Sequence, residues 1–150
     1  SQEQLDFVSK SMGWQQSDNS NTIRIAVMHH HYLPTCFMEQ VEVKRPSSVV
    51  YDAERLMGWL LKYNVKFLLH GHKHQTFVSS IGRYPNASFN DLGEMKNMNV
   101  IGMGGTGAKR CENKFAVIHI EAREMSIEFY RIYSDNTEAD KLVQKIRFPI

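Results

Sequence analysis

Apolar residues recur along the chain with two different spacings, and each spacing predicts a different kind of element. In SQEQLDFVSKSMGW (residues 1–14), Leu5, Val8 and Met12 have helical spacing, which predicts a short amphipathic helix. Residues 49–63 have a wider apolar face of the same period, which predicts a second helix. TIRIAVM (22–28) and NVKFLLH (64–70) are almost continuously apolar and predict buried strands.

The order strand, helix, strand predicts a β-α-β unit, with the strands at 23–28 and 65–70 adjacent in one sheet. After residue 74 the pattern changes to short apolar segments separated by Gly, Asn and charged turns: FVSSI, MNVIGM, FAVIHIEA and MSIEFYRIY. These segments predict mostly antiparallel strands, and KIRFPI near the end predicts an edge strand. The predicted fold class is therefore α/β, a layered sandwich in which a β-α-β unit is followed by mostly antiparallel strands.

Composition is that of an ordinary globular domain. The chain has 150 residues, 42% of them hydrophobic and 23% charged, which is the size of one domain. A net charge of +2 does not indicate a nucleic acid or an anionic membrane as partner. We expect no membrane segment, because no apolar run approaches the roughly 20 residues that span a bilayer. Cys36 and Cys111 are isolated, which fits a reducing compartment and a cytoplasmic location.

Two histidine clusters carry the strongest chemical signal. VMHHHYLP (27–34) follows the first predicted strand, and FLLHGHKHQ (67–75) contains the second. Alternate residues of an extended chain face the same side, so His72 and His74 are placed to bind one ion together, with His29 reaching the same point from the neighbouring strand. A lone His-x-His is more often a solvated pair, but two clusters at equivalent strand ends favour a divalent metal site for zinc, manganese or iron.

The other histidines have weaker claims to a role in the site. Alternation points His30 and His70 away from the metal site, so we expect structural or hydrogen-bonding roles for them. His31 lies in the predicted loop and is a candidate substrate-binding residue. His119, within the apolar strand FAVIHI, is expected to be a strand histidine with an ordinary hydrogen-bond partner.

The glycine-rich stretch IGMGGTGAKR (101–110) does not fit a phosphate-binding loop. That motif needs Lys directly after its last Gly, and Ala108 intervenes here. We expect a tight turn after a strand, near the metal site. The basic pairs at 44–45 and 109–110 suit an anionic substrate, although such pairs are usually solvated.

The ordered motifs resemble the calcineurin-like metallophosphoesterases. The resemblance rests on a strand ending in His-His, the helix DAERLMGWLLKY, the GHKH after a strand, the QEQLDFVSKSM helix and the IGMGGTGA turn, from about Gln2 to Tyr133. It implies a hydrolase with a dinuclear metal site, in which two divalent ions hold a phosphate ester substrate and activate a bridging water. Carried over by position, His29 and His72 bind one ion and His74 the other.

The family's Asp-x-His, Gly-Asp-x-x-Asp and Gly-Asn-His-Asp/Glu motifs do not occur in the chain. The resemblance thus implies that residues 1–150 are the carboxyl-terminal part of a single metallophosphoesterase-like domain. Its catalytic residues are expected upstream of Ser1, in an amino-terminal half that completes the site. We expect the 150 residues alone to be inactive as a phosphomonoesterase or phosphodiesterase and to tend to self-associate. If they are active, Glu39, Glu42 and Asp52 of a second copy are the first carboxylates to test.

Two alternatives remain open on the sequence. One is a non-catalytic metal-binding or interaction module that uses the histidines for one structural or sensing ion. The other is a basic interaction protein in which the histidines are incidental. Substitution of His72 and His74 separates them, because metal binding is unchanged only in the second.

Overall fold

The computed structural model describes residues 2–14, 22–30, 52–71, 76–84, 93–105, 113–132 and 141–150. Within these ranges the chain forms two helices, α1 (Gln2–Ser11) and α2 (Ala53–Lys62), and seven strands. The strands are β1 (Arg24–Met28), β2 (Val65–His70), β3 (Thr76–Arg83), β4 (Lys96–Met103), β5 (Lys114–Ile120), β6 (Glu124–Arg131) and β7 (Lys141–Pro149). Neither of the described helices is long and apolar enough to cross a membrane.

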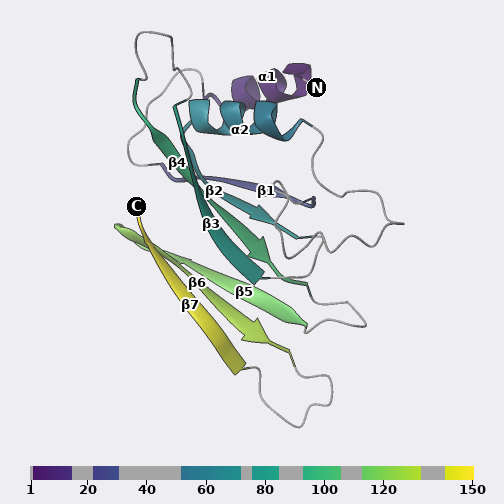
Figure 1. The fold of residues 1–150 in the computed structure, drawn as a ribbon, viewed down its shortest axis with the longest axis vertical. Coiled ribbons are helices and arrows are strands. Elements are labelled where there is room, and N and C mark those ends of the chain that lie inside the picture. The colour runs from purple at the N-terminus through teal and green to yellow at the C-terminus, as the bar shows by residue number, and fades with distance from the viewer. Residues whose placement is uncertain are drawn as a thin grey trace, which may run out of the picture.

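The predicted β-α-β unit is confirmed. β1 and β2 are parallel neighbours with Met28 paired to His70, and α2 lies between them in the chain. They belong to a four-stranded sheet with the strand order β1-β2-β4-β3 (Figure 1). α2 begins at Ala53, and the predicted helical residues 49–51 lie outside the described residues.

The later strands are mostly antiparallel, as predicted. β3 pairs with β4, β5 with β6 and β6 with β7 in antiparallel fashion, and β7 is an edge strand of the second, three-stranded sheet. One pairing has no counterpart in the sequence pattern: β4 lies between β2 and β3 and runs parallel to β2. The result is a mixed sheet above an antiparallel one.

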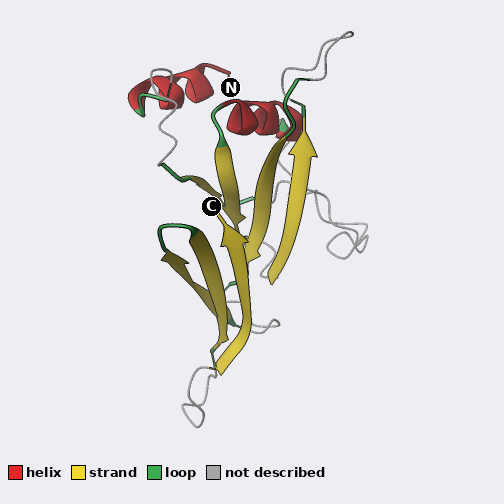
Figure 2. Ribbon diagram, turned by 90° about the vertical axis from the view of Figure 1, so that its left-hand side faces the viewer, coloured by secondary structure: helices red, strands yellow, loops and turns green. Residues whose placement is uncertain are grey.

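Three layers follow from how the apolar residues are distributed. Figure 2 shows the helices, the four-stranded sheet and the three-stranded sheet in that order. One core lies between α2 and the four-stranded sheet and includes Trp59, Leu61, Leu68 and Met98. The other lies between the two sheets and is built from Phe67, Leu69, Ile101, Met125, Ile127, Phe129 and Phe148. β2 and β4 contribute to both cores, and this explains the nearly continuous apolar sequence of β2.

The predicted apolar face of α1 is only partly right. Leu5 packs against the helix-side core, but Val8 and Met12 are 40% and 62% exposed. Ser9 is fully buried instead, and its hydroxyl donates a hydrogen bond to the Asp6 carbonyl oxygen at 3.0 Å. Because the Ser9 hydroxyl is hydrogen-bonded within its own helix, its burial leaves no polar atom without a partner. Ser9 can therefore lie where an apolar residue was expected.

α2 ends at Lys62, and Asn64 shortly after it has a left-handed backbone conformation. Asn64 has a φ of 54°, and its N–H donates to the Leu61 carbonyl oxygen at 3.0 Å. Asparagine tolerates this left-handed conformation better than most residues, so it stops the helix and turns the chain into β2.

Candidate metal site

The two histidine clusters begin at the same end of the four-stranded sheet. His29 directly follows β1 and Gly71 directly follows β2, and the Gly71 N–H donates a hydrogen bond to the His29 carbonyl oxygen at 3.3 Å. This hydrogen bond continues the pairing of β1 with β2 beyond Met28 and His70. It brings the backbone of His29 next to the start of the GHKH motif.

The rings of His29 and His30 lie together on the surface. Both residues are exposed, and their ring centroids are 5.0 Å apart in an edge-to-face arrangement. His30 was predicted to point away from a metal site that also contains His72 and His74; because those two residues lie outside the described residues, this stays a prediction. Its reason was strand alternation, but β1 ends at Met28 and the chain bends at both histidines, so alternation no longer applies.

The remaining predicted site residues lie outside the described residues: His31, His72 and His74, together with Glu39 and Glu42. The convergence of His29 with His72 and His74 thus stays a prediction. Asp52 is described, and its Oδ2 lies 4.0 Å from Nη1 of Arg55 on α2. Among the described residues, no three His, Cys, Asp or Glu side chains gather closely enough to hold a metal ion.

His70 has the structural surroundings that were predicted for it. It is 2% exposed, and its ring centroid lies 5.0 Å from that of Phe77 on β3. Burial lowers the pKa of His70 below its ordinary 6.5, and a backbone hydrogen bond with Gly71 opposes this in part. The neutral imidazole is thus favoured at this buried position.

The strand β4 ends within the glycine-rich stretch, and the tight turn predicted after it extends into residues 106–110, which lie outside the described residues. β4 ends at Met103, and Gly104 follows with a φ of +76°. A Cβ at Gly104 would lie 3.2 Å from Cβ of Lys114 and 3.3 Å from Cγ2 of Thr76. Because His70 pairs with Gly102, Gly104 lies at the sheet end that carries His29 and Gly71. The basic pairs at 44–45 and 109–110 are outside the described residues.

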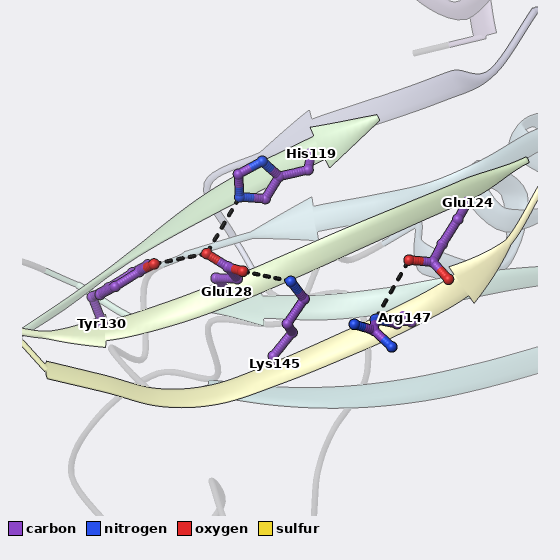
Figure 3. Close-up of polar contacts among 6 residues, drawn as sticks. All are labelled: His119, Glu124, Glu128, Tyr130, Lys145 and Arg147. Atoms are coloured by element: carbon purple, nitrogen blue, oxygen red, sulfur yellow. Dashed lines mark hydrogen bonds and ion pairs between the residues drawn. The ribbon is translucent and has the colours of Figure 1, made fainter. Parts of the chain in front are cut away.

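A second polar cluster, which the sequence did not predict as a group, lies on the three-stranded sheet (Figure 3). Glu128 on β6 accepts hydrogen bonds from Tyr130 Oη and from Lys145 Nζ on β7, both at 2.7 Å. His119 Nε2 on β5 lies 3.3 Å from the same carboxylate. His119 is therefore a strand histidine with an ordinary partner, as expected.

This polar cluster occupies the outer face of the sheet. Met125, Ile127 and Phe129 of β6 are buried, and the alternate Glu124, Glu128 and Tyr130 point to the other side. The alternation within EMSIEFYR could have placed Glu128 and Tyr130 on one face of the strand. It does not indicate that β5 and β7 lie beside β6, so the partners His119 and Lys145 could not be predicted from it. The cluster is a solvated charged face remote in sequence from both histidine clusters.

The sequence matches no family model and no curated protein. Similar solved structures are Vps29 from Chaetomium thermophilum, at 10% identity and a TM-score of 0.41 over 67% of this chain and 49% of that one, and two Vps29 mutants from Entamoeba histolytica. The single mutant has 19% identity and a TM-score of 0.42 over 83% and 54%, and the double mutant 17% and 0.39 over 65% and 48%. The chain spans about half the length of these structures.

The chain has a layered α/β fold. That is the fold class predicted from its sequence, and it rests on the two sheets and their pairing. The similarity to these structures does not extend to activity, metal or partner.

Proposed function

We propose that residues 1–150 form a non-catalytic metal-binding module, in which His29, His72 and His74 bind one divalent ion. The observation that carries this proposal is the Gly71 N–H hydrogen bond to the His29 carbonyl oxygen at 3.3 Å. It aligns the ends of β1 and β2, so that His29 and Gly71, the first residue of the GHKH motif, lie at the same end of the sheet.

The donor set suits a single ion. Three neutral imidazoles bind zinc or manganese at about 2.0–2.2 Å and leave one position for water. An ion with these ligands supplies a polarised water or a structural crosslink between the ends of two strands. The chain's own contribution is to hold the strand ends in parallel register, so that the imidazoles approach from adjacent strands.

Imidazoles alone do not suit a dinuclear site. Two divalent ions a few ångströms apart repel each other strongly, and neutral ligands supply no negative charge to offset this repulsion. A bridging carboxylate is needed, and the sequence motifs that would supply one do not occur in the chain. This is the reason for proposing a non-catalytic role for these 150 residues.

A second candidate function is favoured by the ordered set of motifs. In a longer protein whose preceding segment supplies carboxylates, the same histidines would belong to a metal-dependent phosphoesterase. His31 is then a substrate-binding candidate, and phosphate esters are the substrate class. The two candidates share the histidine ligands and differ in whether a second ion and a nucleophilic water are held.

The proposal is tested by titrating the chain with Mn²⁺ or Zn²⁺ while measuring hydrolysis of an aryl phosphodiester. We expect one ion per chain and no metal-dependent hydrolysis. A variant carrying His72→Ala and His74→Ala should lose metal binding, because one imidazole cannot retain the ion. His119→Ala is the matched control, since His119 lies beside Glu128 and should leave metal binding unchanged.

Two results would contradict the proposal. Equal metal binding by the wild type and the doubly substituted variant would mean that these histidines are incidental. Chelator-sensitive hydrolysis that the two substitutions abolish would support the phosphoesterase instead, and Glu39, Glu42 and Asp52 of a second copy would be the first carboxylates to replace.

A further inference from the structure

His29 and His30 lie side by side just beyond the last residue of β1. Both residues are exposed, and the backbone bends at each of them. Their ring centroids are 5.0 Å apart, and the ring planes make an angle of 87°. Adjacent residues of a strand point to opposite faces, so it is the bend that brings these two imidazoles together. Because both side chains are exposed, packing in a core does not impose this contact.

The distance between the two rings is the distance expected for two ligands of one ion. An imidazole nitrogen lies about 2.0–2.1 Å from zinc, so the ring centroid lies roughly 3 Å from the ion, and two imidazoles in a tetrahedral arrangement have centroids about 5 Å apart. The observed edge-to-face contact differs from such a pair mainly in how the rings are turned. Rotation about χ2 is soft in histidine and turns the ring about an axis near its centroid, so the distance between the rings changes little.

The backbone that carries the pair is held by the neighbouring strand. Met28 pairs with His70, and the Gly71 N–H donates to the His29 carbonyl oxygen at 3.3 Å. His29 is thereby kept next to the start of the GHKH motif, and His30 is the next residue along the chain. Ligands on a backbone that is already fixed lose little conformational freedom when an ion binds.

We propose that His30 is a further ligand of the ion that His29 binds, so that this ion has four imidazole ligands. The inference rests on the proposed metal-binding role of His29, His72 and His74. It departs from the expectation that His30 points away from the site, because that expectation assumed strand alternation and β1 ends at Met28.

A fourth imidazole changes what the ion can do. Structural zinc sites are closed by four protein ligands, whereas catalytic sites keep one position open for water or substrate. With His30 bound, the position that three imidazoles leave for water is filled. The ion then crosslinks the ends of two strands and does not activate a water molecule.

The test is a titration of the chain with Co²⁺, which replaces zinc and absorbs visible light far more strongly in four-coordinate than in six-coordinate sites. The wild type should bind one Co²⁺ with strong absorption. Loss of a group that only supports a ligand lowers metal affinity by roughly 10–100-fold, so His30→Ala should weaken binding by at least about tenfold. His119→Ala is the matched control, because His119 is an exposed histidine beside Glu128 on the other sheet and should bind as the wild type does. Far-ultraviolet circular dichroism checks that each variant is folded.

Azide distinguishes a ligand from a residue that merely supports the fold. Azide should alter the Co²⁺ absorption of His30→Ala, where a position has been opened, and leave that of the wild type unchanged. If His30→Ala binds Co²⁺ as tightly as the wild type while His29→Ala binds it more weakly, or if azide alters the wild-type absorption, His30 is not a ligand and the proposed function stands. A wild type that binds no Co²⁺, or a His29→Ala variant that binds it unchanged, would overturn the proposed function together with this inference.

Discussion

At the residue scale, Glu128 shows how a surface carboxylate is held in its ionised form. The hydrogen bond from Lys145, then the one from Tyr130, lower the pKa of Glu128 from 4.5 to about 2, and His119 adds to this effect. The same hydrogen bond raises the pKa of the Tyr130 hydroxyl, because it holds the hydroxyl proton. The cluster links β5, β6 and β7 across their outer face (Figure 3).

We predict that Glu128 contributes to stability only above acidic pH. Because the pKa of Glu128 is lower in the folded chain, its contribution is complete above about pH 4.5 and is lost as the pH falls towards 2. Thermal unfolding should therefore show Glu128→Gln less stable than the wild type at pH 7, with the difference shrinking below pH 4.5. Glu124→Gln is the control, because Glu124 makes an exposed contact with Arg147 at 3.5 Å. A Glu128→Gln difference that is constant from pH 7 to 2 would contradict this account.

Single residues were predictable where their surroundings follow from the strand itself. His70 and His119 lie in strands with apolar neighbours, and their structural roles agree with the predictions. His30 lies beyond the strand, where alternation stops, so alternation alone does not place its ring. Ser9 was missed because its burial depends on a hydrogen bond to Asp6 that hydrophobic periodicity does not register.

At the element scale, two glycines are expected to respond in opposite ways to the same substitution. Gly104 follows β4 with a φ of +76° and tight approaches to Lys114 and Thr76. We expect Gly104→Ala to lower the free energy of unfolding by about 1–3 kcal/mol. Gly58 lies inside α2 with nothing within 4 Å of an added Cβ, so Gly58→Ala should raise it by roughly 0.5–1 kcal/mol. Urea unfolding measures the free energy of unfolding of both variants. If both substitutions change it in the same direction, the expected strain at Gly104 is contradicted.

The elements themselves were largely visible in the sequence, whereas their order in the sheet was not. Periodicity identified α1, α2, β1 and β2, because helices and buried strands each have a characteristic spacing of apolar residues. The insertion of β4 between β2 and β3 depends on contacts between residues far apart in the chain. No local pattern encodes those contacts, so the sequence predicted adjacent strands only where a β-α-β crossover fixes them.

At the scale of the whole molecule, the parallel pairing of β1 with β2 brings the starts of the two histidine clusters to one end of the sheet. His29 lies just beyond the end of β1. Its partner β2 is buried in both cores and ends at Gly71, beside His29. The layered architecture thus fixes the backbone of the proposed site through β2.

The most direct test of the central claim is a crystal structure of the chain grown with Zn²⁺, with anomalous diffraction used to locate the ion. The account predicts one anomalous peak beyond the ends of β1 and β2, with ring nitrogens of His29, His72 and His74 about 2.0–2.2 Å from it. An ion bound elsewhere, or bound by His72 and His74 with His29 too distant to reach it, would contradict the proposed site.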